Sequence, residues 1–84
     1  MMKITITQAN QDIASTGVSI IFDGVQAATL GPGESTTHET SNERCVVEAV
    51  CGSYREQMTI GIDSTLLIRW ALKPPRMVID HIKI

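Results

Sequence analysis

The chain has 84 residues, a formal net charge of −2 and a hydrophobic content of 43%. This composition excludes an ordinary disordered tail, and the length allows one small domain that removes roughly 60–65% of its unfolded surface from water. The slightly acidic balance gives no overall reason to expect nucleic acid or an acidic membrane as a partner. Charged residues make up only 19%, which is low for a small monomer, so we expect a partner to cover some apolar surface.

Residues 2–7 alternate apolar and polar side chains, which predicts a half-buried strand at the start of the chain. This alternation leaves no uninterrupted apolar region before a cleavage site, and no apolar run reaches the ~18 residues that cross a bilayer. We therefore expect no secretion signal and a cytoplasmic location. Residues 8–16 are mostly polar and predict a connection with room for one helical turn.

The strongest hairpin signal is the dipeptide Asp23-Gly24, which lies between two apolar-rich runs. A two-residue type I′ loop needs positive φ at both positions, which Asp tolerates and Gly accepts freely. Such a loop places Phe22 opposite Val25. We therefore expect Val25 and Ala27 to continue the apolar face of the first arm.

A second turn is predicted at residues 30–34, Leu-Gly-Pro-Gly-Glu, where two glycines bracket a proline. The Gly-Lys-Ser/Thr sequence of a phosphate-binding loop does not follow it. Residues 35–42 are almost wholly polar and predict either an exposed edge strand or a loop. Residues 45–51 are apolar on both faces except at Glu48, which is typical of a strand in the middle of a sheet.

The second half of the chain predicts three further strands. Residues 54–62 alternate in an amphipathic pattern, and residues 65–72 are apolar enough on both sides to lie deep in the fold. Pro74-Pro75 interrupts both helix and ladder pairing, so the chain has to bend before a last apolar run at 76–84. The alternation of that run is imperfect, which indicates either a bulge or cover on both faces.

These elements predict an all-β protein, namely a single small antiparallel β-sandwich or open barrel of seven to eight short strands over residues 1–84. Ile-Ile-Phe-Asp-Gly at 20–24, Leu-Gly-Pro-Gly-Glu at 30–34 and Val-Val-Glu-Ala-Val-Cys-Gly at 46–52 resemble the small β-sandwich domains of the PEGA type. The Thr-Pro and Gly-x-His elements of that family are missing. The resemblance implies a surface-binding or interaction module and transfers no functional residue.

The two cysteines, Cys45 and Cys51, fall within one predicted strand and share a face. At ~3.3 Å per residue their α-carbons lie about 20 Å apart, whereas a disulfide needs them within roughly 7 Å. We expect two buried structural thiols, with metal or redox roles as the alternative.

Two acid–imidazole pairs, His38-Glu39 and Asp80-His81, could in principle join Cys45 or Cys51 in a zinc site. The spacing matches no finger, ribbon or zincin pattern, and adjacent residues of a strand point to opposite faces. We therefore expect solvated histidines at strand ends and assign no catalytic, metal-binding or cofactor-binding residue and no cofactor.

Nucleophilic catalysis finds no support in the pattern either. The chain contains no Gly-x-Ser-x-Gly elbow, and Cys–His catalysis would require an activated thiol in a strand that is expected to be buried. The length also leaves little room for a substrate pocket. We expect that the protein is not an enzyme.

Charge is uneven along the chain, because residues 65–84 carry a net +3 and residues 1–64 a net −5. Arg69, Lys73 and Arg76 could form an anion-binding patch with Trp70 as an aromatic platform. We favour the alternative, in which Trp70 lies in the core and the cations face solvent or form ion pairs with acids of neighbouring strands.

The sequence is most typical of a non-enzymatic protein interaction or assembly module, self-associating into a homo-oligomer and belonging to a phage or a bacterial accessory system. Strand edges and loops 8–16 and 31–44 are its expected contact regions. No nucleic acid or membrane is expected as a partner.

Two other classes stay open. A small-molecule or glycan-binding β-sandwich would need Tyr54 or Trp70 exposed beside polar groups. A metal-dependent enzyme would require His38 and His81 to converge on one ion.

Overall fold

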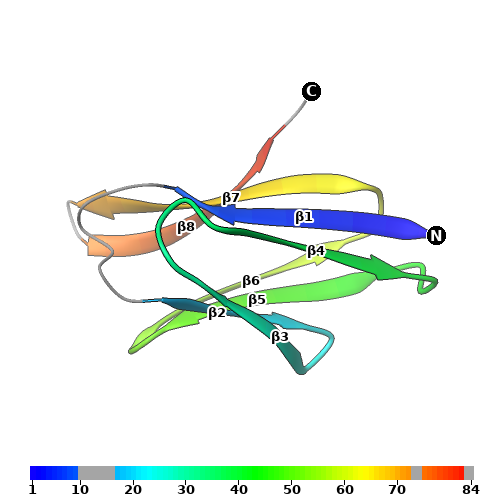
Figure 1. The fold of residues 1–84 in the computed structure, drawn as a ribbon, viewed down its shortest axis with the longest axis horizontal. Coiled ribbons are helices and arrows are strands. Elements are labelled where there is room, and N and C mark those ends of the chain that lie inside the picture. The colour runs from blue at the N-terminus through cyan, green and yellow to red at the C-terminus, as the bar shows by residue number, and fades with distance from the viewer. Residues whose placement is uncertain (10–16, 73–74, 83–84) are drawn as a thin grey trace.

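The computed structural model describes residues 1–9, 17–72 and 75–82, which form two stacked four-stranded sheets (Figure 1). The first sheet, sheet A, has the order β4-β1-β7-β8, and the second, sheet B, has the order β3-β2-β5-β6. The strands are β1 (Met2–Gln8), β2 (Val18–Phe22), β3 (Val25–Leu30), β4 (Ser35–Thr40), β5 (Cys45–Cys51), β6 (Tyr54–Ile60), β7 (Ser64–Leu72) and β8 (Pro75–Ile82). The all-β sandwich is confirmed, and the sheets do not close into a barrel.

Five of the six strand pairings are antiparallel, as predicted, but β1 and β7 run parallel side by side. The chain crosses between the sheets after β1, β3, β4 and β6, so β7 returns to the sheet of β1 by way of sheet B. Parallel neighbours require such a long connection, whereas a hairpin can join only antiparallel strands. The wholly antiparallel arrangement expected from the sequence is therefore corrected at this one pair.

The β2–β3 hairpin turns at the predicted dipeptide, with φ of 50° at Asp23 and 83° at Gly24. Phe22 lies opposite Val25, as expected. The prediction that Val25 continues the buried face is wrong, because this residue directly follows the turn and is 69% exposed.

A bulge in β3 explains why the apolar pattern of this strand breaks. The partners of Ile21 and Ile20 are Gln26 and Ala28, which leaves Ala27 as an extra, exposed residue. The prediction that Ala27 faces the core is therefore wrong. The same extra residue returns Leu30 to the inner face, where it is 3% exposed.

The polar segment after the second turn is an edge strand, β4, paired antiparallel with β1 along its whole length. The turn before it is tied to the end of β1, because the Gly33 N–H donates to the Gln8 carbonyl and the Gln8 N–H donates to the Glu34 carbonyl. Gln8 belongs to β1 and is fully buried, so the expected polar connection begins one residue later. The remainder of that connection, residues 10–16, lies outside the described residues.

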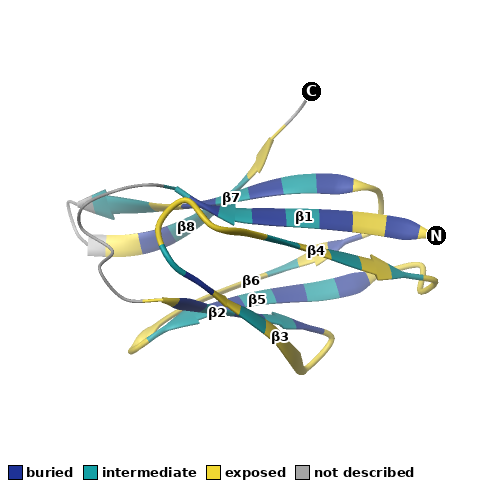
Figure 2. Ribbon diagram, viewed as in Figure 1, coloured by how far each residue is buried: buried dark blue, intermediate teal, exposed yellow. Residues whose placement is uncertain are grey.

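The core lies between the sheets and is built by alternate residues of the inner strands, as Figure 2 shows for β1, β2, β5 and β7. As predicted, β5 and β7 each have a strand on both sides. The buried apolar side chains are Met2, Ile4, Ile6, Val18, Ile20, Phe22, Leu30, Cys45, Val47, Ala49, Ile60, Leu66, Ile68 and Met77.

The outer strand β6 is shorter and more exposed than its sequence predicts. It ends at Ile60, and Ile62, expected on its buried face, is 68% exposed. Most of its other residues face solvent, because β6 is the edge of sheet B (Figure 2).

The last strand, β8, is the edge of sheet A and begins at Pro75. Pro75 lies opposite Leu72, so the proline opens the strand instead of preventing its pairing; an edge strand tolerates this position. The register with β7 is unbroken from Pro75 to Ile82, so no bulge repairs the pattern. The final two residues, 83–84, lie outside the described residues.

Candidate functional site

The residues considered for a zinc site are dispersed over the fold. His38 is on β4 and His81 on β8, the two opposite edges of sheet A, so three strand spacings of about 14 Å in total separate them. Cys45 and Cys51 lie in sheet B, Cys45 buried and Cys51 half-buried. Over residues 1–9, 17–72 and 75–82, no three His, Cys, Asp or Glu side chains gather as a metal-binding group.

The β2–β3 turn anchors the start of β5 through Asp23. Its carboxylate accepts a hydrogen bond from the Val46 N–H at 2.8 Å and its own N–H donates to the Val46 carbonyl at 2.9 Å. The Asn42 amide donates to the second carboxylate oxygen at 3.5 Å. The left-handed backbone of the Asp-Gly turn thus forms the hairpin, and the side chain of Asp23 holds the start of β5.

These contacts set the titration of two neighbouring groups. The hydrogen bond from the Val46 N–H, helped by the Cys45 thiol, holds the pKa of Asp23 below its usual value of 3.8. Burial, with the charge of Asp23 beside it, raises the pKa of Cys45 to about 11. A thiol with a raised pKa stays protonated and is a poor nucleophile or metal ligand. The cluster is therefore a structural clamp.

The proposed anion patch is divided between the two faces of sheet A. Arg69 points outward and forms an ion pair with Asp80 of the neighbouring strand. Trp70 points inward, is partly buried against the core, and meets the Tyr54 ring edge-on with centroids 5.2 Å apart. Arg76 is exposed, and Lys73 lies outside the described residues. The packing of Trp70 against the core and the pairing of Arg69 with a neighbouring acid are confirmed, and Arg69 lies on the opposite face of sheet A from Trp70.

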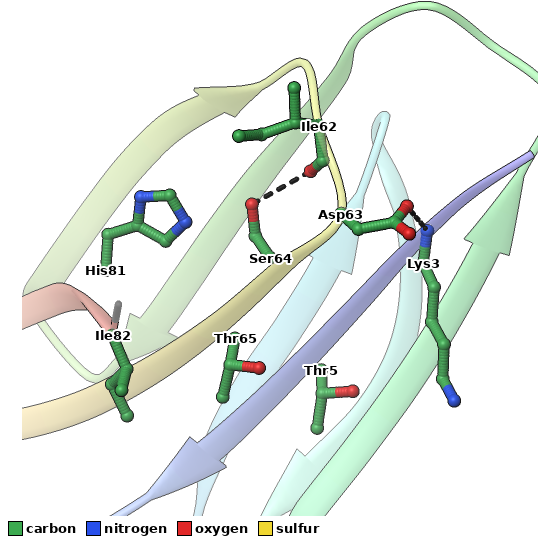
Figure 3. Close-up of a pocket in the computed structure, with 8 residues that line it drawn as sticks. All are labelled: Lys3, Thr5, Ile62, Asp63, Ser64, Thr65, His81 and Ile82. Atoms are coloured by element: carbon green, nitrogen blue, oxygen red, sulfur yellow. Dashed lines mark hydrogen bonds between the residues drawn. The ribbon is translucent and has the colours of Figure 1, made fainter. Parts of the chain in front are cut away.

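A shallow depression of about 580 Å³ lies at one end of sheet A (Figure 3). Its lining is mixed, and two of its polar side chains bond to nearby backbone: Asp63 accepts from the backbone N–H of Lys3, and the Ser64 hydroxyl donates to the Ile62 carbonyl, both at 2.8 Å. His81 lies on the far side of the depression from Lys3, beyond β7 (Figure 3).

A groove of about 360 Å³ runs between the free edges of β6 and β8, where sheets A and B approach each other. Apolar side chains and two oppositely charged ones, Glu56 and Arg76, line it; its residues are Glu56, Gln57, Met58, Arg76, Met77, Val78 and Ile79. Within residues 1–9, 17–72 and 75–82, each of these two strands has a paired neighbour on one side only. Backbone groups on the other side are therefore available to a further strand, which makes this edge the best candidate for a functional surface.

Comparisons with models of protein families, with curated proteins and with solved structures found no match. The resemblance to PEGA-type domains therefore stays a prediction. No helix in the part of the chain that the structure describes is long and apolar enough to span a membrane.

Sequence reasoning singled out histidines and cysteines and missed the groove. The sequence predicts the two strands that flank the groove, β6 and β8, but whether they lie side by side depends on the order of strands in each sheet. One sequence signal was available: Arg76, Val78 and Asp80 alternate charge, apolar residue and opposite charge along one face of β8.

Proposed function

We propose that this protein is a non-enzymatic interaction and assembly module that associates with copies of itself through its strand edges. The observation that carries the proposal is the pair of sheet edges, β6 and β8, on either side of a groove lined by both apolar and charged residues. An unpaired strand edge with apolar side chains is a template for another strand.

Exposed apolar side chains add support. Val25, Ile62 and Ile82 are 69%, 68% and 41% exposed, although the chain is short of charge. They occupy the ends and edges of the sandwich, in keeping with contacts that form around the edges. The buried thiol of Cys45, which forms no disulfide, is consistent with the cytoplasmic location included in the proposal.

Light scattering coupled to size-exclusion chromatography tests self-association directly. We expect a particle mass that rises with protein concentration to a multiple of the 9.2 kDa chain. A constant mass of one chain up to high micromolar concentration overturns the proposal.

A further inference from the structure

We propose that β8 pairs antiparallel with β8 of a second copy, about a twofold axis at Val78, so that two A sheets join into one continuous sheet. This inference rests on the self-association proposed above and names its interface. It also predicts the symmetry, because a twofold contact uses the same surface on both copies.

The free edge of β8 is regular enough to accept a partner strand. Its pairing with β7 runs without a shift from Thr65 and Ile82 to Leu72 and Pro75. No strand among the residues that the structure describes pairs with the opposite side of β8. A long, regular edge of this kind offers several backbone hydrogen bonds to an added strand.

Side chains on the outer face of β8 are complementary to themselves. In the antiparallel register centred on Val78, Arg76 of each copy lies opposite Asp80 of the other, so the same ion pair forms twice. Arg76 is exposed and makes no ion pair with any residue that the structure describes. Asp80 already holds Arg69 and has a side chain 42% exposed, which leaves it open to a second cation. Opposite charges directly across a strand pair stabilise the pairing.

Residues on the inner face of β8 match in the same register. Met77 of one copy lies opposite Ile79 of the other, and both line the groove between β6 and β8. Met77 is 2% exposed and Ile79 packs partly against the core. The partner strand would therefore extend the apolar interior of each sandwich and cover the groove of about 360 Å³.

The other three edges lack this complementarity. The bulge at Ala27 interrupts β3, and a bulged edge is a poor template for pairing. Strand β4 carries His38 and Glu39 on opposite faces and has no cation to pair with Glu39. On β6 the cation Arg55 is occupied by Glu48 at 3.5 Å, and Glu56 points to the other face.

The test uses two single charge reversals, Arg76→Asp and Asp80→Arg, in the full chain. Each places like charges across the twofold contact twice, so we expect the dimer dissociation constant to rise by about tenfold or more. Mixing the two variants creates a heterodimer in which both pairs attract, and the double variant R76D/D80R restores attraction within the homodimer. Sedimentation equilibrium at low salt, with one variant carrying a mass tag, measures all four.

Matched controls separate the interface from general charge effects. Arg55→Asp makes the same substitution on the edge strand β6, and Glu39→Arg reverses an acid on β4; neither should change the dissociation constant. Arg69→Gln removes the cation that holds Asp80 within the chain and leaves the edge intact. It controls for the loss of this internal ion pair in Asp80→Arg.

The possible results are distinct. The pairing is supported if both single variants have a higher dimer dissociation constant than the wild type and the mixture of the two regains the wild-type value. A wild-type dimer that none of the β8 reversals weakens overturns the β8 interface while self-association stands, and a monomeric wild type overturns both. If circular dichroism shows that a reversal has unfolded, oxidative cross-linking of Val78→Cys decides, because antiparallel partners at the axis lie within disulfide distance. A covalent dimer beyond the wild-type level supports the interface, and its absence overturns it.

Discussion

The imidazole of His38 lies flat on the ring of Phe22, with centroids 4.3 Å apart and planes 9° apart. His38 comes from β4 at the edge of sheet A and Phe22 from β2 in sheet B, so this contact joins the two sheets. The inner face of β4 is otherwise made of threonines. This ring pair is thus the main aromatic contact by which the polar edge strand reaches the core, and we expect it to hold β4 against the sandwich.

Replacing His38 by Ala should lower the free energy of unfolding by about 1 kcal/mol, because an aromatic pair contributes 0.5–1.5 kcal/mol beyond its buried area. His38→Phe keeps the stack and should retain wild-type stability. Urea unfolding followed by circular dichroism measures both. Equal losses for Ala and Phe would show that the ring contact does not stabilise β4.

Asp23 makes the stability dependent on pH in the acid range. Its folded pKa lies below the value of 3.8 that it has in a free chain, so the unfolded state binds more protons between the two values. The stabilisation is therefore complete above pH 3.8 and is lost as the pH falls through the folded pKa. Asp23→Asn keeps a residue that tolerates positive φ and an acceptor for the Val46 N–H. We therefore expect this variant to lack the loss of stability that protonation of Asp23 causes at low pH.

The measurement is the urea midpoint of the wild type and of Asp23→Asn between neutral pH and about pH 2. Asp23→Ala is the control for the backbone, because Ala tolerates the φ of 50° poorly and should lower stability at every pH. Parallel acid profiles for the wild type and Asp23→Asn would contradict the proposed clamp.

The sequence predicts much of the fold because local rules decide most strands. Alternation predicted β1, runs that are apolar on both faces predicted β5 and β7, and the left-handed tolerance of Asp23-Gly24 predicted the hairpin. These signals act over a few residues and need no knowledge of neighbouring strands.

What the sequence could not predict depends on contacts between distant segments. The parallel pairing of β1 with β7 follows from the path of the chain through sheet B, and the bulge at Ala27 follows from the need to bury Leu30. The stack of His38 on Phe22 joins strands of different sheets, so a histidine that the sequence predicts to be solvated is half-buried instead. The groove between β6 and β8 was missed for the same reason, since it joins strands of different sheets.

Cys45 should make the protein less stable at alkaline pH. Burial raises its pKa from 9.0 to about 11, so the unfolded chain loses its thiol proton first as the pH rises. The stabilisation is complete below pH 9.0 and is lost as the pH rises toward 11. Cys45→Ala removes the titrating group and should flatten the alkaline profile, which urea midpoints between about pH 8 and pH 11 would show.

The same burial protects Cys45 from thiol reagents. In a Cys51→Ser variant the native protein should react slowly with a disulfide reagent at neutral pH, and the urea-unfolded chain should react at once. Rapid labelling of the native variant would mean that Cys45 is accessible, and the alkaline prediction would fail with it.

Gln8 is a polar side chain at a core position of β1. Its side chain is fully buried, and neither amide atom has a hydrogen-bond partner in the described part of the chain. Leaving a buried polar group unpaired costs about 1–3 kcal/mol, so replacing it by an apolar side chain of similar shape should recover part of that cost. We expect Gln8→Met to raise the free energy of unfolding by about 1 kcal/mol.

Gln8→Glu should lower the free energy of unfolding, because a buried charge is more costly than a buried amide. Gln57→Met, on the exposed strand β6, is the matched control and should leave stability unchanged. If urea unfolding shows instead that Gln8→Met destabilises the protein, the amide is not an unpaired group, and a hydrogen bond to it offsets the cost of burying it.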